Sequence, residues 1–134
     1  LSGDTTVHAI TDVTGFGLLG HAYEVARESK LSLVVNASDV PLFSRANELA
    51  RGGFITGASK RNWASYGASI VLPAGMPDWQ RDLLADPQTS GGLLIACAPE
   101  RADAILKKVV DAGFKSAKII GRAEAGPAQV RIEN

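Results

Sequence analysis

The chain has 134 residues, of which 46% are hydrophobic and 21% are charged, and its formal net charge is zero. This length suffices for one domain with a buried core, and the balanced charge argues against a general nucleic-acid-binding protein, which would carry an excess of Lys and Arg. No apolar run approaches the ~20 residues that a membrane-spanning helix needs. The single cysteine, Cys97, excludes an internal disulfide and indicates a reducing compartment, so we expect a cytoplasmic protein.

The first part of the chain predicts two strands and two helices. Residues 6–12 predict a short strand that leads into a glycine-rich turn, and residues 31–35 predict a second strand. Residues 15–29 and 41–51 predict helices, and Gly52-Gly53 ends the second one. The first helix has a hydrophobic stripe at helical periodicity, formed by Leu18, Leu19, Ala22, Val25 and Ala26. The second helix is expected to bury Leu42, Ala46, Leu49 and Ala50.

The middle of the chain shows weaker patterns. Residues 54–67 have no clear period and predict a loop with at most one helical turn. Residues 68–72 predict a strand, and residues 77–84 predict a short helix with proline in its first turn. Residues 86–92, DPQTSGG, predict a loop because turn-forming residues dominate them, and residues 93–98 predict a buried strand.

The last part predicts a helix and two strands. Residues 99–112 have the clearest amphipathic pattern, and Gly113 stands where a left-handed helix cap is expected. Residues 118–121 and 128–133 predict strands that reverse at Gly126-Pro127. This order of elements indicates an α+β fold, a mixed β-sheet with helices packed on it, in a single domain of residues 1–134. Because the sequence starts at Leu1 rather than Met, we expect it to be a piece of a longer protein.

Three glycines after the first predicted strand have the G-x-G-x-x-G spacing of a dinucleotide-binding turn: Gly15, Gly17 and Gly20. In such a site, Asn36 or Asp39 would stand roughly where a ribose-binding acid is expected. However, Asp12 precedes these glycines, and a carboxylate repels a pyrophosphate unless a cation lies between them. The motif alone is also a weak signal, so a nicotinamide-dependent reductase is kept as an alternative.

A divalent cation accounts for the carboxylate beside the glycines. An Asp at a strand end, facing a helix N-terminus, commonly holds Mg²⁺ while phosphates fill other coordination positions, so Asp12 is a candidate metal ligand, one among several. The hydroxyls of Thr11 and Thr14 are candidate phosphate or nucleotide contacts, and Gly15 and Gly17 let backbone amides approach a phosphate closely. In the alternative interpretation, Asp12 only caps the helix and the glycines only make a tight turn.

The loop of residues 86–92 has two candidate roles. Thr89, Ser90 and Gly91 are candidates for contacts with a phosphate at a cleft between domains. Alternatively, the loop is a tight connection that packs against the Gly15 turn and contacts no ligand. Asp86 is expected to cap a turn, since Asp before Pro often begins one.

The remaining polar residues predict little chemistry. We expect His21 to be a packing or surface histidine, although it could reach a phosphate or metal, and Cys97 to be a small buried residue. Lys60, Arg61 and Asn62 are expected in a solvated loop, with an anion contact or an ion pair to a partner domain as the alternative. Nucleic-acid stacking beside Trp63 is disfavoured by the zero net charge.

Two longer stretches, TDVTGFGLLGHAYEVA (residues 11–26) and LLADPQTSGGLLIACAPERA (residues 83–102), resemble the C-terminal domain of selenophosphate synthetase (selenide, water dikinase). The resemblance runs through essentially the whole chain, including VPLFSRANELARGGF (residues 40–54). Aminoimidazole ribonucleotide synthetase and thiamine-monophosphate kinase are similar in fold but carry other residues at the TDVTGFG position. The resemblance therefore implies the fold of an aminoimidazole ribonucleotide synthetase-like C-terminal domain.

The same resemblance implies a function. The family makes selenophosphate, AMP and phosphate from selenide, ATP and water, with Mg²⁺ as cofactor, and Asp12 matches its metal-ligating aspartate from the C-terminal half. The N-terminal ATP-binding domain would carry the reactive Cys or selenocysteine, most metal ligands and the contacts of a homodimer. We therefore expect no catalytic residue in this chain and no activity of the chain alone. The implied partners are that domain and the substrates ATP and selenide, with no nucleic acid and no membrane.

Two further alternatives are kept. A non-catalytic module would bind a partner or an anion, and another ATP-using member of the same superfamily would act on a different substrate.

Overall fold

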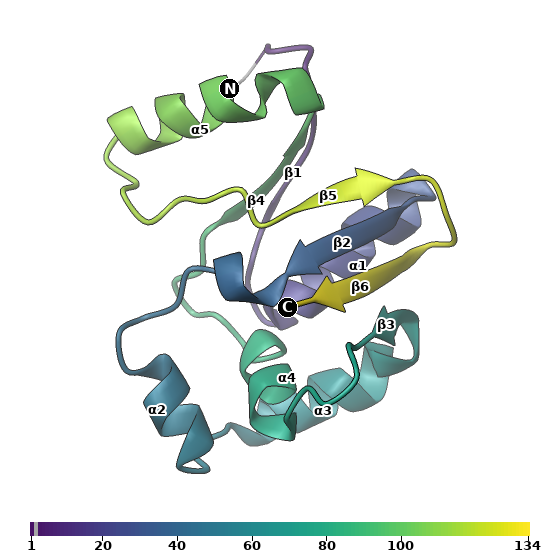
Figure 1. Ribbon diagram of the computed structural model, residues 1–134, viewed down its shortest axis with the longest axis vertical. Helices are drawn as coiled ribbons and strands as arrows, with labels where there is room; N and C mark the ends of the chain where they lie inside the picture. Colours follow the sequence, from purple (N-terminus) through teal and green to yellow (C-terminus); the bar gives the residue numbers. More distant parts are fainter. Residues whose placement is uncertain (2) are drawn as a thin grey trace.

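The structure of the protein, a computed structural model, describes residue 1 and residues 3–134 (Figure 1). These residues form an α+β fold with two sheets, in agreement with the predicted class. One sheet is an antiparallel ribbon of β1 (Val7–Asp12) and β4 (Leu93–Cys97), which we call the β1–β4 ribbon. Figure 1 shows that this ribbon connects helix α5 (Ala102–Asp111) with the rest of the molecule.

The larger sheet has four strands in the order β3-β6-β2-β5. Strand β2 (Ser32–Asn36) runs parallel to β6 (Gln129–Glu133) and antiparallel to β5 (Gly121–Glu124). The edge strand β3 (Ile70–Val71) runs parallel to β6. The sheet is mixed, as predicted, and the chain reverses near Gly126-Pro127. However, β2 lies between β5 and β6, so these two strands do not form a hairpin.

Helix α1 (Gly17–Ser29) covers one face of this sheet (Figure 1). Three residues of its predicted stripe, Leu19, Ala22 and Ala26, are fully buried. They pack against alternate residues of the two central strands: Leu33, Val35, Val130 and Ile132. Because successive side chains of a strand point to opposite faces, this face of the sheet forms the hydrophobic core.

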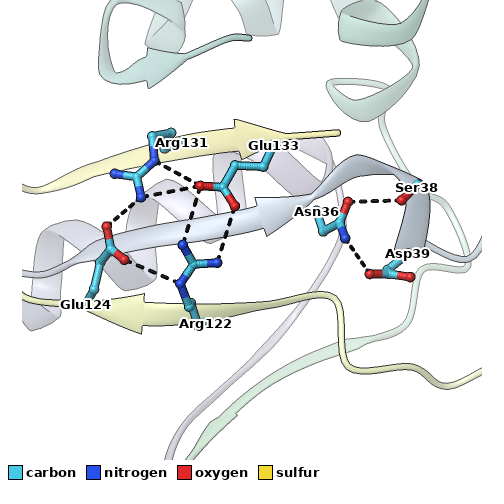
Figure 2. Close-up of polar contacts among 7 residues, drawn as sticks. All are labelled: Asn36, Ser38, Asp39, Arg122, Glu124, Arg131 and Glu133. Carbon is cyan, nitrogen blue, oxygen red and sulfur yellow. Dashed lines mark hydrogen bonds and ion pairs between the residues drawn. The ribbon is translucent and has the colours of Figure 1, made fainter.

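The opposite face of the sheet carries charged side chains from β5 and β6 (Figure 2). Arg131 lies 2.6 Å from Glu124, and Arg122 and Arg131 lie 3.3 and 3.4 Å from Glu133. Val34 stands in register between Arg122 and Arg131 and is almost fully buried. The positive and negative charges balance, so this network is a neutral cover for the sheet.

The other helices lie at the two ends of the molecule (Figure 1). Helices α2 (Ala46–Arg51), α3 (Gly57–Tyr66) and α4 (Asp78–Leu84) gather at one end, and α5 lies at the other. Short 3-10 turns occur at Ala37–Asp39, Gly67–Ser69 and Pro99–Arg101. Within the described residues, no helix is both long enough and apolar enough to cross a membrane.

Three predictions of local structure are wrong. Helix α3 forms where a loop was expected; Thr56 caps it by accepting a hydrogen bond from the Ser59 amide (3.2 Å). Helix α2 occupies only the second half of the predicted helix, and Leu42 and Leu49 are each 40% exposed rather than buried. The strand expected at 118–121 is displaced, because β5 begins at Gly121.

The β1–β4 ribbon and α5 leave apolar surface uncovered. Strand β4 was expected to be buried, but Leu93 is 64% exposed and the rest of the strand is only partly buried. Of the described residues of α5, Ile105 alone is buried. An open groove of ≈1820 Å³ is lined by the ribbon, α5 and the sheet, with apolar side chains that include Ile95, Leu106 and Ile120. The amphipathic pattern of this region thus predicted helix and strand correctly but not what covers them.

Candidate functional site

Strand β1 ends in a tight turn of residues 13–17, which we call the glycine turn. Asp12 closes the strand in register with Leu93 of β4, and its side chain is exposed. Within the part of the chain that the structure describes, no hydrogen bond or ion pair engages the Asp12 carboxylate. The first turn of α1 has no side-chain cap, so the alternative in which Asp12 caps this helix is wrong.

Backbone contacts fix the shape of the glycine turn. The Thr14 carbonyl accepts hydrogen bonds from the amides of Gly17 and Gln88, both at 3.0 Å. Gly17 has a φ of +70°, and a Cβ at this position would lie 2.6 Å from the carbonyl carbon of Ala85, so only glycine fits. Helix α1 begins here without a side-chain cap, but the Gly17 amide is bound to Thr14 and Leu19 is fully buried. The amides left to water or an anion are therefore those of the exposed residues 14–16 in the turn itself.

The 86–92 loop packs directly on the glycine turn. The Val13 amide donates to the Gly92 carbonyl (2.9 Å), and a Cβ on Gly91 would lie 1.8 Å from the Val13 carbonyl oxygen. Gly91 therefore makes the close backbone packing expected of a tight connection. Thr89 and Ser90 precede Gly91 and are exposed beside the glycine turn.

Helix α3 holds the glycine turn and the 86–92 loop together. The Asn62 side-chain amide donates to the carbonyls of Gly15 and Ala85, both at 2.9 Å. Tyr66, one helical turn further along the same face, donates its hydroxyl to the Phe16 carbonyl (2.6 Å). Burial raises the pKa of Tyr66 to about 12. Two side chains of one helix therefore fix two consecutive carbonyls of the turn, those of Gly15 and Phe16.

This role of Asn62 was not predicted, because residues 54–67 were expected to form a loop. Lys60 and Arg61 are exposed, in line with the solvated surface expected of them. Asp86 was expected to cap a turn, but it accepts hydrogen bonds at 2.7 Å from two hydroxyls at the start of α3: Thr56 and Ser59. The sequence indicates a shared role of Asn62 and Tyr66 only once α3 is recognised as a helix, because their spacing then places both side chains on one face.

His21 connects the glycine turn with helix α1. It is only 7% exposed, and both of its ring nitrogens have partners. Nδ1 lies 2.8 Å from Glu24 Oε2, and Nε2 lies 3.1 Å from Thr14 Oγ1. The ring also packs against Phe16, with the ring centroids 5.7 Å apart. The prediction of a packing histidine is confirmed by this burial, but the two polar contacts were not foreseen.

Most of the predicted site residues meet at the glycine turn. The backbone bonds described above bring the 86–92 loop, with Thr89, Ser90 and Gly91, against the residues that follow Asp12. Thr11 differs: it is half-buried, and its hydroxyl donates to the Asp12 carbonyl (3.2 Å). Because neighbouring residues of a strand face opposite sides, Thr11 lies on the side of β1 away from Asp12.

The dinucleotide alternative does not fit the fold. That class requires a parallel, doubly wound sheet before the glycine turn, whereas β1 pairs antiparallel with β4. Asn36 and Asp39, the candidates for a ribose-binding acid, bond to each other at 2.7 Å at the end of β2 (Figure 2).

The donor groups at the turn fit part of a magnesium site. An exposed carboxylate without a protein partner is the type of oxygen ligand that Mg²⁺ prefers. Among the described residues, however, no cluster of three or more His, Cys, Asp or Glu side chains could hold a metal ion. Asp12 therefore suits one coordination position, and the other ligands of such an ion must come from elsewhere.

The fold and this turn define the class of protein. The family described as "AIR synthase related protein, C-terminal domain" matches residues 1–133, and the chain belongs to this family. Solved structures of other proteins share the fold. Hydrogenase maturation protein HypE in complex with ATP matches with a TM-score of 0.62 and 18% identity, over 99% of this chain and 34% of that one. Thiamine-monophosphate kinase from Stenotrophomonas maltophilia matches with a TM-score of 0.57 and 21% identity, over 96% and 32%.

Closer relatives are selenide, water dikinases. The chain is 62% identical over 132 residues to the selenide, water dikinase of Rhizobium meliloti and 49% identical over 126 residues to that of Pseudomonas straminea. These matches cover 98% and 94% of this chain but only 38% and 35% of the relatives. The resemblance to selenophosphate synthetase stated from the sequence motifs is therefore confirmed.

Proposed function

We propose that this chain is the C-terminal domain of a longer selenide, water dikinase. The enzyme would convert selenide, ATP and water into selenophosphate, AMP and phosphate in the cytoplasm. Support comes from the 62% identity to a relative of that name, which far exceeds the 18–21% identity to the other ATP-binding or kinase structures of the same fold. The chain spans about a third of these relatives, so the rest of the enzyme would include the N-terminal ATP-binding domain.

The observation that carries the nucleotide assignment is the exposed Asp12 carboxylate beside the uncapped start of α1. The carboxylate attracts a cation, and the positive end of the helix attracts an anion. Mg²⁺ with bound phosphates supplies both charges. Asp12 would hold the ion, and the amides of the exposed residues 14–16 of the glycine turn would donate to phosphate oxygens. When bound, Mg²⁺ neutralises the charge that develops as the phosphoryl group leaves. Asn62 would keep the turn in place by holding the Gly15 carbonyl.

The apolar surface next to Asp12 suggests where the N-terminal domain docks. Leu93 stands opposite Asp12 on the same face of the β1–β4 ribbon, and Ile10, two residues before Asp12 on that face, is 47% exposed. Large exposed apolar side chains around a polar group are typical of an interface. A domain that covers this face would bring its own metal ligands opposite Asp12, so the active site would lie in the cleft between the two domains. The homodimer expected of the full enzyme would use contacts of that N-terminal domain.

The test uses the full-length enzyme that contains this domain. In Asp12→Asn, the carboxylate becomes a neutral amide of the same shape, so we expect Mn²⁺, used in place of Mg²⁺, to bind in the presence of ATP at least about tenfold more weakly. Selenide-dependent AMP formation should fall with it. The matched control is Asp103→Asn, an exposed acid on α5, which should change neither. Unchanged Mn²⁺ binding and turnover in Asp12→Asn would refute the proposed site.

A second measurement tests the division between domains. The chain alone should form no AMP from ATP and selenide, because the reactive residue and most metal ligands would lie in the other domain. Selenide-dependent AMP formation by the chain alone would contradict this assignment.

A further inference from the structure

Three side chains form a polar chain from the glycine turn into helix α1. Thr14, at one end, is exposed next to Asp12, and Glu24, at the other, is partly exposed on α1. His21 lies between them, almost fully buried, with its nitrogens 3.1 Å from Thr14 Oγ1 and 2.8 Å from Glu24 Oε2. The proposed function assigns roles to Asp12 and the backbone amides, but it gives His21 and Glu24 none.

The chemistry of these groups sets the direction of both hydrogen bonds. An ionised carboxylate accepts hydrogen bonds and cannot donate, so the proton of the His21–Glu24 contact lies on Nδ1. When the ring is neutral, Nε2 carries a lone pair and accepts, and the Thr14 hydroxyl is then the donor. In that state the Thr14 proton points inward at His21, and the lone pairs of Oγ1 face outward.

The backbone around Thr14 gives this arrangement a fixed position. The Thr14 carbonyl is held by the amides of Gly17 and Gln88, and the Phe16 ring packs against the imidazole. The main chain and the side chain of Thr14 are therefore both fixed before any ligand binds, which is the condition for an oriented contact.

We infer that Thr14 Oγ1 is a hydrogen-bond acceptor for the hydrated divalent cation at Asp12, and that His21, held by Glu24, is the residue that positions it. This inference rests on the proposed function. Water bound to a cation donates hydrogen bonds, and an outward lone pair on Oγ1 suits it. A phosphate oxygen needs a hydrogen-bond donor. Thr14 cannot be that donor while its hydroxyl donates to His21. The glycine turn therefore divides its contacts: Asp12 and Thr14 face the cation shell, and backbone amides face the phosphates.

The test measures Mn²⁺ binding to the full-length enzyme in the presence of ATP, together with the binding of metal-free ATP and the melting temperature. Thr14→Val removes the hydroxyl and keeps the shape, so we expect about tenfold weaker Mn²⁺ binding with metal-free ATP binding unchanged. Thr14→Ser keeps the hydroxyl and should recover most of this loss. His8→Asn, at the other histidine, which is exposed on β1, is the matched control and should leave Mn²⁺ binding as it is.

Two substitutions of His21 separate a positioning role from a structural one. Gln places an acceptor near the position of Nε2 and can still bind the Thr14 proton, whereas Asn reaches only the position of Nδ1 and keeps the Glu24 contact. Both replace a buried ring and should lower the melting temperature. We expect His21→Asn to weaken Mn²⁺ binding about as much as Thr14→Val does, and His21→Gln to recover most of it.

The outcomes distinguish the inference from the function on which it rests. Loss of metal-free ATP binding in Thr14→Val would show that Thr14 faces phosphate, and equal Mn²⁺ binding by His21→Asn and His21→Gln would show a structural role; either result overturns the inference. If Asp12→Asn abolishes Mn²⁺ binding while Thr14→Val leaves it unchanged, the proposed function stands and the inference fails. If Asp12→Asn also leaves it unchanged, the proposed function itself fails.

Discussion

Two regions of this domain differ in how completely their apolar side chains are buried. Around α1 and the four-stranded sheet, large apolar residues such as Leu19, Val130 and Ile132 have almost no exposed surface. On the β1–β4 ribbon, Ile10 and Leu93 are about half exposed or more, and so are Phe114 and Ile119 in the segment that follows α5. The first region therefore has a core of its own, and the second has the surface expected of a half-interface. The glycine turn stands where the two regions meet.

At that border the backbone carbonyls of the turn have partners, whereas Asp12 and the apolar side chains beside it have none in the part of the chain that the structure describes. Asn62 and Tyr66 of helix α3 donate hydrogen bonds to carbonyls of the turn, so the shape of the turn needs no second domain. The Asp12 carboxylate and the apolar side chains beside it have no such partners within the described residues. The contrast teaches that the turn forms by itself, whereas the proposed metal site would be completed only by the proposed partner domain.

The largest expected effect tests the region with its own core. Leu19→Ala removes a fully buried side chain between α1 and the sheet, so we expect the free energy of unfolding to fall by about 2–5 kcal/mol. Urea denaturation measures this. Leu42→Ala, at a position that is 40% exposed, should cost clearly less. Equal losses at the two positions would remove the distinction between core and surface.

A smaller effect tests the border. Tyr66→Phe leaves the Phe16 carbonyl without its donor, so we expect a loss of about 1–2 kcal/mol. The pKa of Tyr66 is raised in the folded chain from 10.0 to about 12, so its contribution is complete below pH 10 and is lost as the pH rises from 10 to 12. Urea midpoints between pH 9 and 12 should show this decline in the wild type and a weaker one in Tyr66→Phe. Tyr23→Phe is the control and should keep the decline; if both variants keep it, Tyr66 is not its cause.

The smallest effect tests the uncovered region. In the chain alone, Leu93→Ser should change the free energy of unfolding by no more than about 0.5 kcal/mol, because Leu93 is already exposed. In the full-length enzyme the same change should lower the melting temperature and speed limited proteolysis between the domains, because the proposed partner would lose an apolar contact. If the chain alone loses as much stability as the full enzyme, no partner domain covers this face.

Local patterns in the sequence predicted the elements whose neighbours are close along the chain. The stripe of α1 predicted its buried face, and the strand, acid and glycines of residues 6–17 predicted a strand that ends at Asp12 beside an exposed turn. Both depend on periodicity and on turn chemistry, which act over a few residues. Gly113 likewise has the positive φ that its position after the helix predicted.

Features that depend on distant partners were not predictable in this way. Helix α3 has no hydrophobic period, and its Asn62 is anchored on Gly15, 47 residues away. The turn at Gly126-Pro127 has the composition of a hairpin, and nothing local shows that β2 lies between the strands it joins. The apolar composition of β4 predicted burial, since a sequence does not state which surface another domain is to cover.

The position of β6 has a consequence for biosynthesis. This strand is an inner member of the sheet, between β3 and β2, although it follows every other described element along the chain. A ribosome must therefore translate residues 129–133 before the sheet can close, and until then β2 presents an unpaired edge of the kind that nascent chains aggregate through. A ribosome that stalls shortly before Val130 would release a chain in which all the described helices have been translated but the sheet is still open.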